Sequence, residues 1–194
     1  FRMISSFKDL TVLVTGASSG IGKAMARELA AQGAQLILVS RNAQRLEQEA
    51  EDLRIRFGVK VHVFPEDLEC FEERLELFAW VQKSGLTVDV LVNNAGVAYY
   101  GPFAESNFKE TGTMLDLNVH ALTHLTWLFL PGMFERGKGG VLNVASTAGF
   151  QPLPNLAVYA ATKAFVLNFS EALSEECRGR GVRVFCLCPG NTLT

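Results

Sequence analysis

Residues 11–30 read TVLVTGASSGIGKAMARELA, which is a short apolar run, a glycine-rich turn and then a helical pattern. Glycines at 16, 20 and 22 permit a tight turn, close approach of backbone N–H groups to a phosphate, and close packing of the helix on a sheet. The N-terminus of that helix adds partial positive charge. The stretch therefore predicts a βα unit that binds the pyrophosphate of a dinucleotide. A βα turn without a ligand is the alternative.

The alternation of apolar runs and helical patterns continues along the whole chain. We expect strands at residues 11–14, 36–39, 61–64, 88–92, 141–144 and 182–187, and helices at 21–32, 43–57, 71–83, 111–134 and 159–177. Apolar strands joined by helices favour a parallel sheet, because parallel strands need crossover connections and are buried on both faces. The sequence predicts one domain over residues 1–194, an α/β fold with a doubly wound, Rossmann-like parallel sheet in three layers.

Composition and charge narrow the range of partners. The chain has 194 residues, of which 48% are hydrophobic, and a net charge of -2. It therefore lacks the basic footprint of a protein that binds nucleic acid or an anionic membrane. It also lacks an apolar run of the roughly 20 residues that span a bilayer and the pattern of a secretion signal. We expect a small-molecule partner, no nucleic-acid or membrane partner, and a cytoplasmic location. Phe1 and Arg2 precede the first methionine, Met3, which indicates a fragment or a processed start.

Neither the cysteines nor the histidines predict a metal site. The four cysteines, at positions 70, 177, 186 and 188, lack the spaced pairs of a zinc site and are too few for a disulfide framework in a chain of this length. Cys186 and Cys188 flank Leu187 in an apolar strand, which favours buried thiols over redox chemistry. His120 and His124 are one helical turn apart, but no third ligand accompanies them, which favours packing or a subunit interface.

The residues after the second predicted strand bear on the choice of cofactor. An NAD site usually places an acidic residue there, against the ribose 2′-hydroxyl. This chain has Ser40, which does not repel a phosphate, and Arg41, which can pair with one through charge-assisted hydrogen bonds. The sequence therefore predicts NADP rather than NAD. The alternative is that Arg41 only caps a solvated loop.

Several motifs follow the glycine turn in a fixed order. They are Thr-Gly-x-x-x-Gly-Ile-Gly at 15–22, Asn-Asn-Ala-Gly at 93–96, the serine of Val144-Ala145-Ser146, Tyr159-x-x-x-Lys163 and Pro189-Gly190. Together they resemble the short-chain dehydrogenase/reductase family, and they span nearly the whole chain. Ser19 stands where many NADP-using relatives have a basic residue, so the NADP prediction depends on Ser40 and Arg41.

The chemistry of four residues explains why they are candidate catalytic groups. Tyr159 and Lys163 are four residues apart, so they share one face of a helix. An isolated tyrosine gives up its proton only at strongly basic pH, and a nearby ammonium favours the phenolate. Tyr159 is therefore the predicted general acid or base, and Ser146 the predicted hydrogen-bond partner of the substrate oxygen. The resemblance implies that Asn118 completes a proton relay through a water.

The glycine turn and the resemblance together imply a set of cofactor-binding residues. They are Gly16, Ser18, Ser19, Gly20, Ile21, Gly22, Ser40, Arg41, Asp67, Leu68, Asn94, Ala95, Gly96, Tyr159, Lys163, Pro189, Gly190 and Thr194. Asp67 matches the family position that contacts the adenine, and a helix N-cap is its alternative role. Asn94 matches a contact near the adenosine ribose, whereas Asn93 is expected to secure the sheet.

These features predict an oxidoreductase that transfers a hydride between NADP(H) and a carbonyl or secondary alcohol of an apolar small molecule, of ketone or 3-oxoacyl type. Apolar residues after the fourth strand and after Ser146 suggest the substrate pocket, with loop packing as the alternative: Tyr99, Tyr100, Phe103, Phe150, Pro152, Leu153 and Pro154. A sensor or scaffold that binds NADP without turnover, and an epimerase or dehydratase, are the alternative functions.

The resemblance also carries expectations about assembly and length. It implies a homodimer or homotetramer that packs through the long helix at 111–134 and the helix that carries Tyr159. Members of the family continue past the position of Thr194 with a substrate lid and a last strand. We therefore expect residues 1–194 to stop before those elements.

Overall fold

Six parallel strands form a single sheet in the order β3-β2-β1-β4-β5-β6. The computed structural model describes residues 7–192. The strands are β1 (Thr11–Thr15), β2 (Gln35–Val39), β3 (Val61–Phe64), β4 (Val90–Asn93), β5 (Gly139–Val144) and β6 (Val182–Leu187). The main helices are α1 (Gly20–Ala31), α2 (Ala43–Phe57), α3 (Phe71–Lys83), α4 (Phe108–Leu115), α5 (Leu122–Arg136) and α6 (Ala157–Glu176). The predicted doubly wound α/β fold is confirmed.

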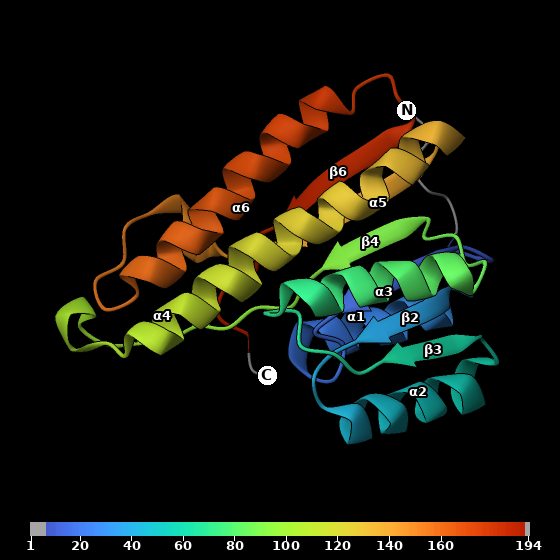
Figure 1. Ribbon diagram of the computed structural model, residues 1–194, viewed down its shortest axis with the longest axis horizontal. Coiled ribbons are helices and arrows are strands. Elements are labelled where there is room, and N and C mark those ends of the chain that lie inside the picture. The colour runs from blue at the N-terminus through green and yellow to red at the C-terminus, as the bar shows by residue number, and fades with distance from the viewer. Residues whose placement is uncertain (1–6, 193–194) are drawn as a thin grey trace.

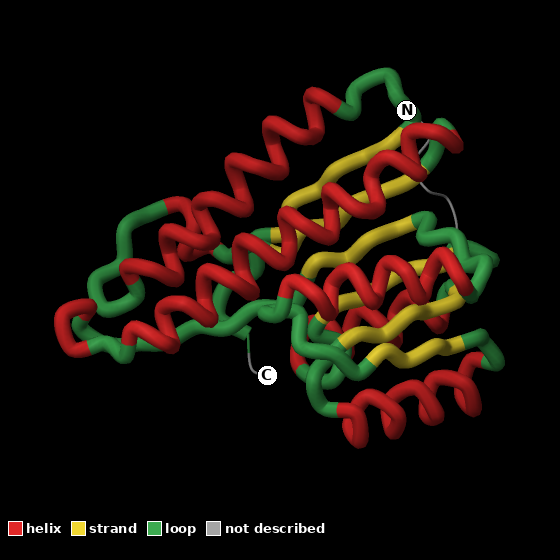
Figure 2. Tube along the Cα trace, viewed as in Figure 1, coloured by secondary structure: helices red, strands yellow, loops and turns green. Residues whose placement is uncertain are grey.

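Apolar side chains cover both faces of the sheet. Because successive residues of a strand point to opposite faces, Val12 and Val14 of β1 pack against α1 and α2, whereas Leu13 packs against α3 and α5. Figure 1 shows α3, α5 and α6 in front of the sheet, and Figure 2 shows the strands between the helical layers. The continuous apolar runs of the sequence are thus explained by burial on two sides.

The order of the strands creates the crevice in which a site can form. β1 pairs with β2 on one side and with β4 on the other. From β1 the chain continues to β2 on one side of the sheet, and from β4 it continues to β5 on the other side. The loops that follow β1 and β4 therefore separate at the carboxyl edge of the sheet. Ligands bind at such a switch point in open α/β sheets.

Local signals set the ends of several helices. Asn42 caps α2, since its side chain accepts a hydrogen bond of 2.9 Å from the backbone N–H of Arg45. Gly58 ends the same helix with a left-handed φ of 66°, a conformation that glycine adopts without steric cost. The predicted bounds 43–57 therefore agree with the structure.

Two details differ from the sequence predictions. The helix predicted at 111–134 is interrupted by a π-helical turn at Asp116–Ala121, which lies between α4 and α5. β5 begins at Gly139, two residues before the predicted start of this strand at residue 141. Within residues 7–192, none of the helices has both the length and the apolar character needed to cross a membrane.

Candidate active site

A cavity of about 910 Å³ opens at the carboxyl edge of the sheet. Most of the residues predicted from the sequence line it: Gly16, Ser18, Ser19, Gly20, Ile21, Ser40, Arg41, Asp67, Leu68, Asn94, Ala95, Gly96, Ser146, Tyr159, Lys163, Pro189 and Gly190. Gly22 and Asn118 lie behind this lining, and Thr194 lies outside the described residues. The structure thus brings together residues that are far apart in the sequence.

The glycine turn leaves no room for side chains at two positions. Gly16 has a left-handed φ of 65°, and a Cβ there would lie 2.8 Å from Nδ2 of Asn94. A Cβ on Gly22 would collide with the carbonyl of Gly16 and the same amide. Backbone N–H groups can therefore approach a ligand closely here, which is the expected cradle for a pyrophosphate.

Thr15 and Asn94 tie the glycine turn to the loop after β4. The Thr15 hydroxyl accepts from the backbone N–H groups of Asn94 and Ala95 at 2.9 and 3.0 Å. The Asn94 amide donates to the carbonyl oxygens of Thr15, at 2.9 Å, and Gly16, at 3.3 Å. The sequence motif contained Thr15, but its role as a clamp depends on a partner that lies 79 residues away. Asn94 thus shapes the cofactor cradle from behind.

The N-terminus of α1 lies at the cavity, and no acidic residue in its first turn neutralises the partial positive charge of the helix. Ser19 is the N-cap, its side chain makes no capping hydrogen bond, and the first turn of the helix contains no acidic residue. Ser19 and Gly20 both line the cavity. The partial positive charge of the helix is therefore available to an anion such as a pyrophosphate.

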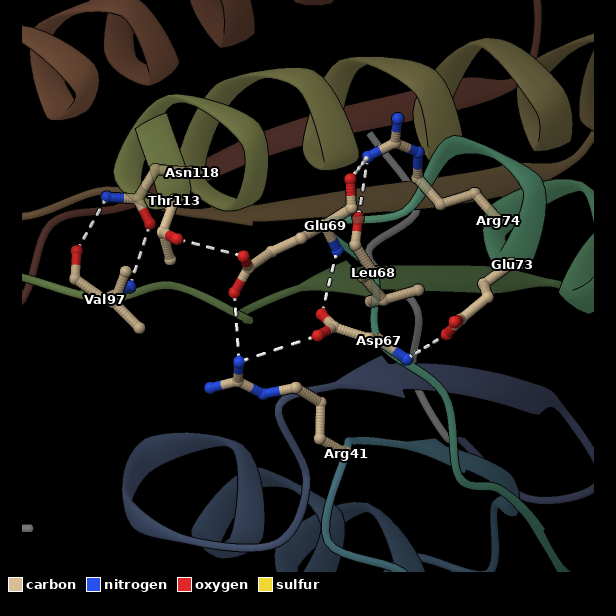
Figure 3. Close-up of polar contacts among 9 residues, drawn as sticks. All are labelled: Arg41, Asp67, Leu68, Glu69, Glu73, Arg74, Val97, Thr113 and Asn118. Atoms are coloured by element: carbon tan, nitrogen blue, oxygen red, sulfur yellow. Dashed lines mark hydrogen bonds and ion pairs between the residues drawn. The ribbon is translucent and has the colours of Figure 1, made fainter. Parts of the chain in front are cut away.

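Ser40 and Arg41 follow β2 and line the same cavity. The hydroxyl oxygen of Ser40 is buried and has no hydrogen-bond partner within residues 7–192. A buried polar atom without a partner is uncommon and is expected where a ligand completes the site. Arg41 is paired with two carboxylates, Asp67 at 3.6 Å and Glu69 at 3.0 Å (Figure 3). Arg41 thus lies at the cavity as well as on an exposed loop.

The loop at residues 67–69 is held by several hydrogen bonds. The Asp67 carboxylate accepts from the backbone N–H of Glu69 at 3.1 Å, and the Glu73 carboxylate accepts from the backbone N–H of Asp67. The N-cap of α3 is Cys70, so the alternative assignment of Asp67 as that N-cap is wrong. Glu69 was not a predicted site residue, because nothing in its local sequence distinguishes it from other surface acids.

Lys163 is a buried amine beside Tyr159. Lys163 is only 6% exposed, and its Nζ donates to the carbonyl of Val144 at 2.9 Å. The same nitrogen lies 5.7 Å from the centroid of the half-buried Tyr159 ring. Burial lowers the pKa of Lys163 to about 8. A lysine pKa shifted this far by burial is typical of functional sites.

Ser146 begins the segment after β5 and lines the cavity with Tyr159. Its hydroxyl oxygen accepts a hydrogen bond of 3.1 Å from the backbone N–H of Ala148. That bond uses one acceptor position of the hydroxyl and leaves its proton free to donate to a substrate oxygen.

Asn118 lies in the π-helical turn and is 1% exposed. Its amide oxygen accepts from the backbone N–H of Val97 at 2.9 Å, and its amide nitrogen donates to the Val97 carbonyl at 2.9 Å (Figure 3). The amide nitrogen also donates to the Thr162 hydroxyl at 3.1 Å. Its side chain thus fixes the loop that contains Gly96 and Val97. The proposed water relay remains a prediction, and it would need groups of Asn118 other than these engaged amide atoms.

Two other side-chain expectations can be compared with the structure. Asn93 donates to Thr126 at 3.0 Å and to Asn143 at 2.9 Å, so its predicted role in securing the sheet is confirmed. His120 contacts Asp116 at 2.9 Å, whereas His124 accepts from Arg74 at 3.1 Å. The two histidines therefore have separate partners.

The predicted apolar substrate pocket is divided in two. Leu153 lines the large cavity, together with Leu156 and Gln151. A second hollow of about 350 Å³ contains Tyr99, Tyr100 and Phe103 with residues of α4 and α6. These three aromatic residues line this second hollow and not the large cavity.

The model of the family of short chain dehydrogenases matches residues 10–194. The chain belongs to this family. The resemblance seen in the sequence motifs is confirmed over almost the whole chain.

Curated relatives of this short-chain dehydrogenase include the very-long-chain 3-oxoacyl-CoA reductases of Anas platyrhynchos and Homo sapiens. The first is 39% identical over 183 residues, which are 91% of this chain and 58% of the relative. The second is 36% identical over 183 residues, 91% of this chain and 57% of the relative. The chain thus spans a little over half the length of these relatives.

Solved structures of other short-chain dehydrogenases share the fold. L-sorbose reductase from Gluconobacter frateurii, complexed with NADPH and L-sorbose, superposes with a TM-score of 0.92 at 34% identity and covers 99% of this chain and 73% of its own. A short-chain dehydrogenase from Sphingobium yanoikuyae in complex with NADPH superposes with a TM-score of 0.90 at 35% identity, over 95% of this chain and 72% of its own.

Proposed function

We propose that this chain carries the cofactor site and the catalytic groups of an NADP-dependent oxidoreductase that reduces a carbonyl group, or oxidises the corresponding secondary alcohol. The observation that carries the proposal is the buried ammonium of Lys163 beside the ring of Tyr159, at one end of a cavity whose other end is the glycine turn. A site that only binds a nucleotide has no need of this pair.

The residues of the cavity fit NADP(H). The glycine turn and the N-terminus of α1 suit the pyrophosphate, and the hydroxyl of Ser40 has an unused hydrogen bond. Arg41 supplies a guanidinium for the 2′-phosphate. Pro189 and Gly190 line the cavity on the side of Tyr159 and Ser146, where they suit the nicotinamide end. The NADPH complexes of the structural relatives support this choice of cofactor.

The chemistry of the protein groups is acid–base catalysis. A reduced nicotinamide, when bound, supplies the hydride to the carbonyl carbon. Tyr159 donates its phenolic proton to the carbonyl oxygen, and Ser146 donates a hydrogen bond to the same oxygen. Lys163 stabilises the phenolate that remains through its positive charge. In the reverse direction Tyr159 accepts the hydroxyl proton of the alcohol.

A 3-oxoacyl group or another ketone on an apolar body is the substrate class we propose. Leu153 and Leu156 line the cavity near the catalytic side chains and offer apolar contact. The names of the curated relatives, very-long-chain 3-oxoacyl-CoA reductases, support an acyl substrate. The structural relatives also include L-sorbose reductase, so the fold alone does not select an acyl substrate. The apolar side chains that line the cavity of this chain favour the acyl class.

Turnover tests the proposal against its alternatives. We expect NADPH consumption with apolar ketones and 3-oxoacyl thioesters, and loss of at least about 100-fold in kcat for Tyr159→Phe with NADPH affinity retained, because general acid catalysis contributes about 100- to 10,000-fold. A sensor or scaffold would bind NADPH without consuming it. An epimerase or dehydratase would convert substrate with no net change in the nicotinamide. Cytoplasmic location and assembly into a homodimer or homotetramer stay predictions.

A further inference from the structure

Arg41, the proposed partner of the 2′-phosphate, is already paired with carboxylates of this chain. Its Nη1 lies 3.0 Å from a carboxylate oxygen of Glu69 and 3.6 Å from one of Asp67, so the guanidinium points between two negative charges (Figure 3). Asp67 already has an assigned place beside the adenine. Glu69 has no assigned role, and it is the nearer of the two carboxylates.

Glu69 is held in place from both sides. Its second carboxylate oxygen accepts a hydrogen bond of 3.0 Å from the hydroxyl of Thr113 on α4. The backbone next to it is fixed by Arg74, which is 5% exposed and donates to the carbonyl of Leu68 at 2.7 Å. Because both the side chain and the backbone are anchored, the carboxylate stays beside Arg41 when a ligand arrives.

The Arg41–Glu69 pair is too exposed to be strong. The side chain of Arg41 is 57% exposed and that of Glu69 is 23% exposed, and partly exposed ion pairs contribute little stability. A phosphate can therefore share the guanidinium without unfolding the loop. The phosphate must nevertheless bind close to the fixed negative charge of Glu69. Repulsion between charges several ångströms apart near a protein surface lowers the affinity by about three- to tenfold.

We propose that Glu69 limits the preference of this site for NADP(H) over NAD(H): its fixed carboxylate competes for Arg41 and selectively weakens binding of nucleotides that carry a 2′-phosphate. The inference rests on the proposed function, since it requires a cavity that binds NADP(H). NADH lacks the 2′-phosphate, so the competition leaves its affinity unchanged. Glu69 acts through Arg41 and is a positioning residue for cofactor recognition.

Substitution Glu69→Gln tests the role of the charge. The amide oxygen of glutamine can still accept the Thr113 hydrogen bond, so the change removes the charge and preserves the tether. Fluorescence titration of the purified chain should show the Kd for NADPH falling about three- to tenfold, while the Kd for NADH stays within about twofold. The gain should shrink at high salt, because the charges are partly exposed.

Two variants serve as controls. Thr113→Val removes one hydrogen bond to Glu69 but keeps its charge, its ion pair with Arg41 and the backbone contacts with Arg74, so the carboxylate should stay beside Arg41. The ratio of NADPH to NADH affinity should therefore stay within about twofold of the wild type. Glu175→Gln removes a carboxylate that pairs with Arg178 at 2.6 Å on the surface, outside the lining of the cavity, and should likewise leave the ratio unchanged.

The outcomes separate this inference from the proposed function. A selective gain in NADPH affinity in Glu69→Gln alone supports the role of the charge. An unchanged ratio in Glu69→Gln, with both nucleotides bound, overturns the inference and leaves the function standing. An equal shift in Thr113→Val also overturns it, because position rather than charge would then matter. Failure of the wild type to bind either nucleotide contradicts the proposed function itself.

Discussion

The ammonium of Lys163 lies 5.7 Å from the centroid of the Tyr159 ring and donates at 2.9 Å to the carbonyl of Val144. The two side chains come from one face of α6, and the carbonyl comes from the end of β5. The amine of Lys163 is therefore fixed to the sheet by a hydrogen bond. The site depends on this docking of α6 against β5.

Burial of Lys163 predicts a pH dependence of stability. Burial lowers the pKa of the folded lysine to about 8 from an ordinary value of 10.5, so the unfolded chain binds more protons between these two pH values. This group's contribution to the free energy of unfolding therefore rises as pH increases from about 8 toward 10.5, and the cost of burying the charge is fully present below pH 8.

Thermal unfolding of the chain without ligands can detect this effect. Lys163→Met has no such titration, so the difference in Tm between the variant and the wild type should decrease as pH rises from about 8 to 10. The neighbouring thiol of Cys186 stays neutral through this window, because burial raises its pKa to about 11. Parallel Tm curves for the two proteins would contradict the buried-charge interpretation.

Asn118→Ala should cost stability as well as activity. The substitution leaves the backbone N–H and carbonyl of Val97 and the hydroxyl of Thr162 without their partner, and we expect a loss of about 2–4 kcal/mol in the free energy of unfolding. Asn168→Ala is a matched control, because Asn168 is exposed and bonds only one helical carbonyl at 2.9 Å. That control should lose less than about 0.5 kcal/mol in denaturant unfolding. Similar losses in both variants would argue against the structural role.

Arg41→Ala should weaken NADPH binding far more than NADH binding. Loss of a charge-assisted hydrogen bond to a phosphate costs about 1.5–3 kcal/mol, which corresponds to roughly 10- to 150-fold in Kd. The Kd for NADH should change by less than about threefold, since NADH has no group for this guanidinium. Equal losses for the two nucleotides would show that Arg41 acts on the fold of the loop and not on the 2′-phosphate.

Gly22→Ala should abolish nucleotide binding, because the new methyl group meets the carbonyl of Gly16 and the amide of Asn94. Gly112→Ala makes the same chemical change in α4, where a Cβ meets nothing within 4 Å. It should stabilise the chain by about 0.5–1 kcal/mol, because alanine favours a helix over glycine. Titration with NADPH and thermal unfolding distinguish the two variants, and normal binding by Gly22→Ala would contradict the cradle.

Local patterns made much of the fold and site predictable. The glycine turn and the Tyr159–Lys163 spacing are local signals, so their positions could be read before the structure. The bounds of α2, α3, β3 and β6 also agree with the predictions, since caps and apolar runs mark their ends. The large cavity then follows from the carboxyl edge of a parallel sheet.

Other features depend on contacts between distant residues and could not be predicted. The bond between Glu69 and Thr113 joins residues 44 apart in the sequence, and that between Asn118 and Val97 joins residues 21 apart. The π-helical turn at Asp116–Ala121 has no periodic signature in a leucine-rich helix. The separation of Tyr99, Tyr100 and Phe103 from the large cavity likewise depends on how their loop folds.

The most direct test is a single-turnover reaction with an apolar ketone and NADPH that carries deuterium at both C4 positions of its nicotinamide ring. We expect the deuterium to appear on the carbinol carbon of the product. We expect Tyr159→Phe to bind the labelled cofactor but to transfer almost none of its deuterium. Recovery of unlabelled product from the wild type, or full transfer by Tyr159→Phe, would contradict hydride transfer assisted by Tyr159.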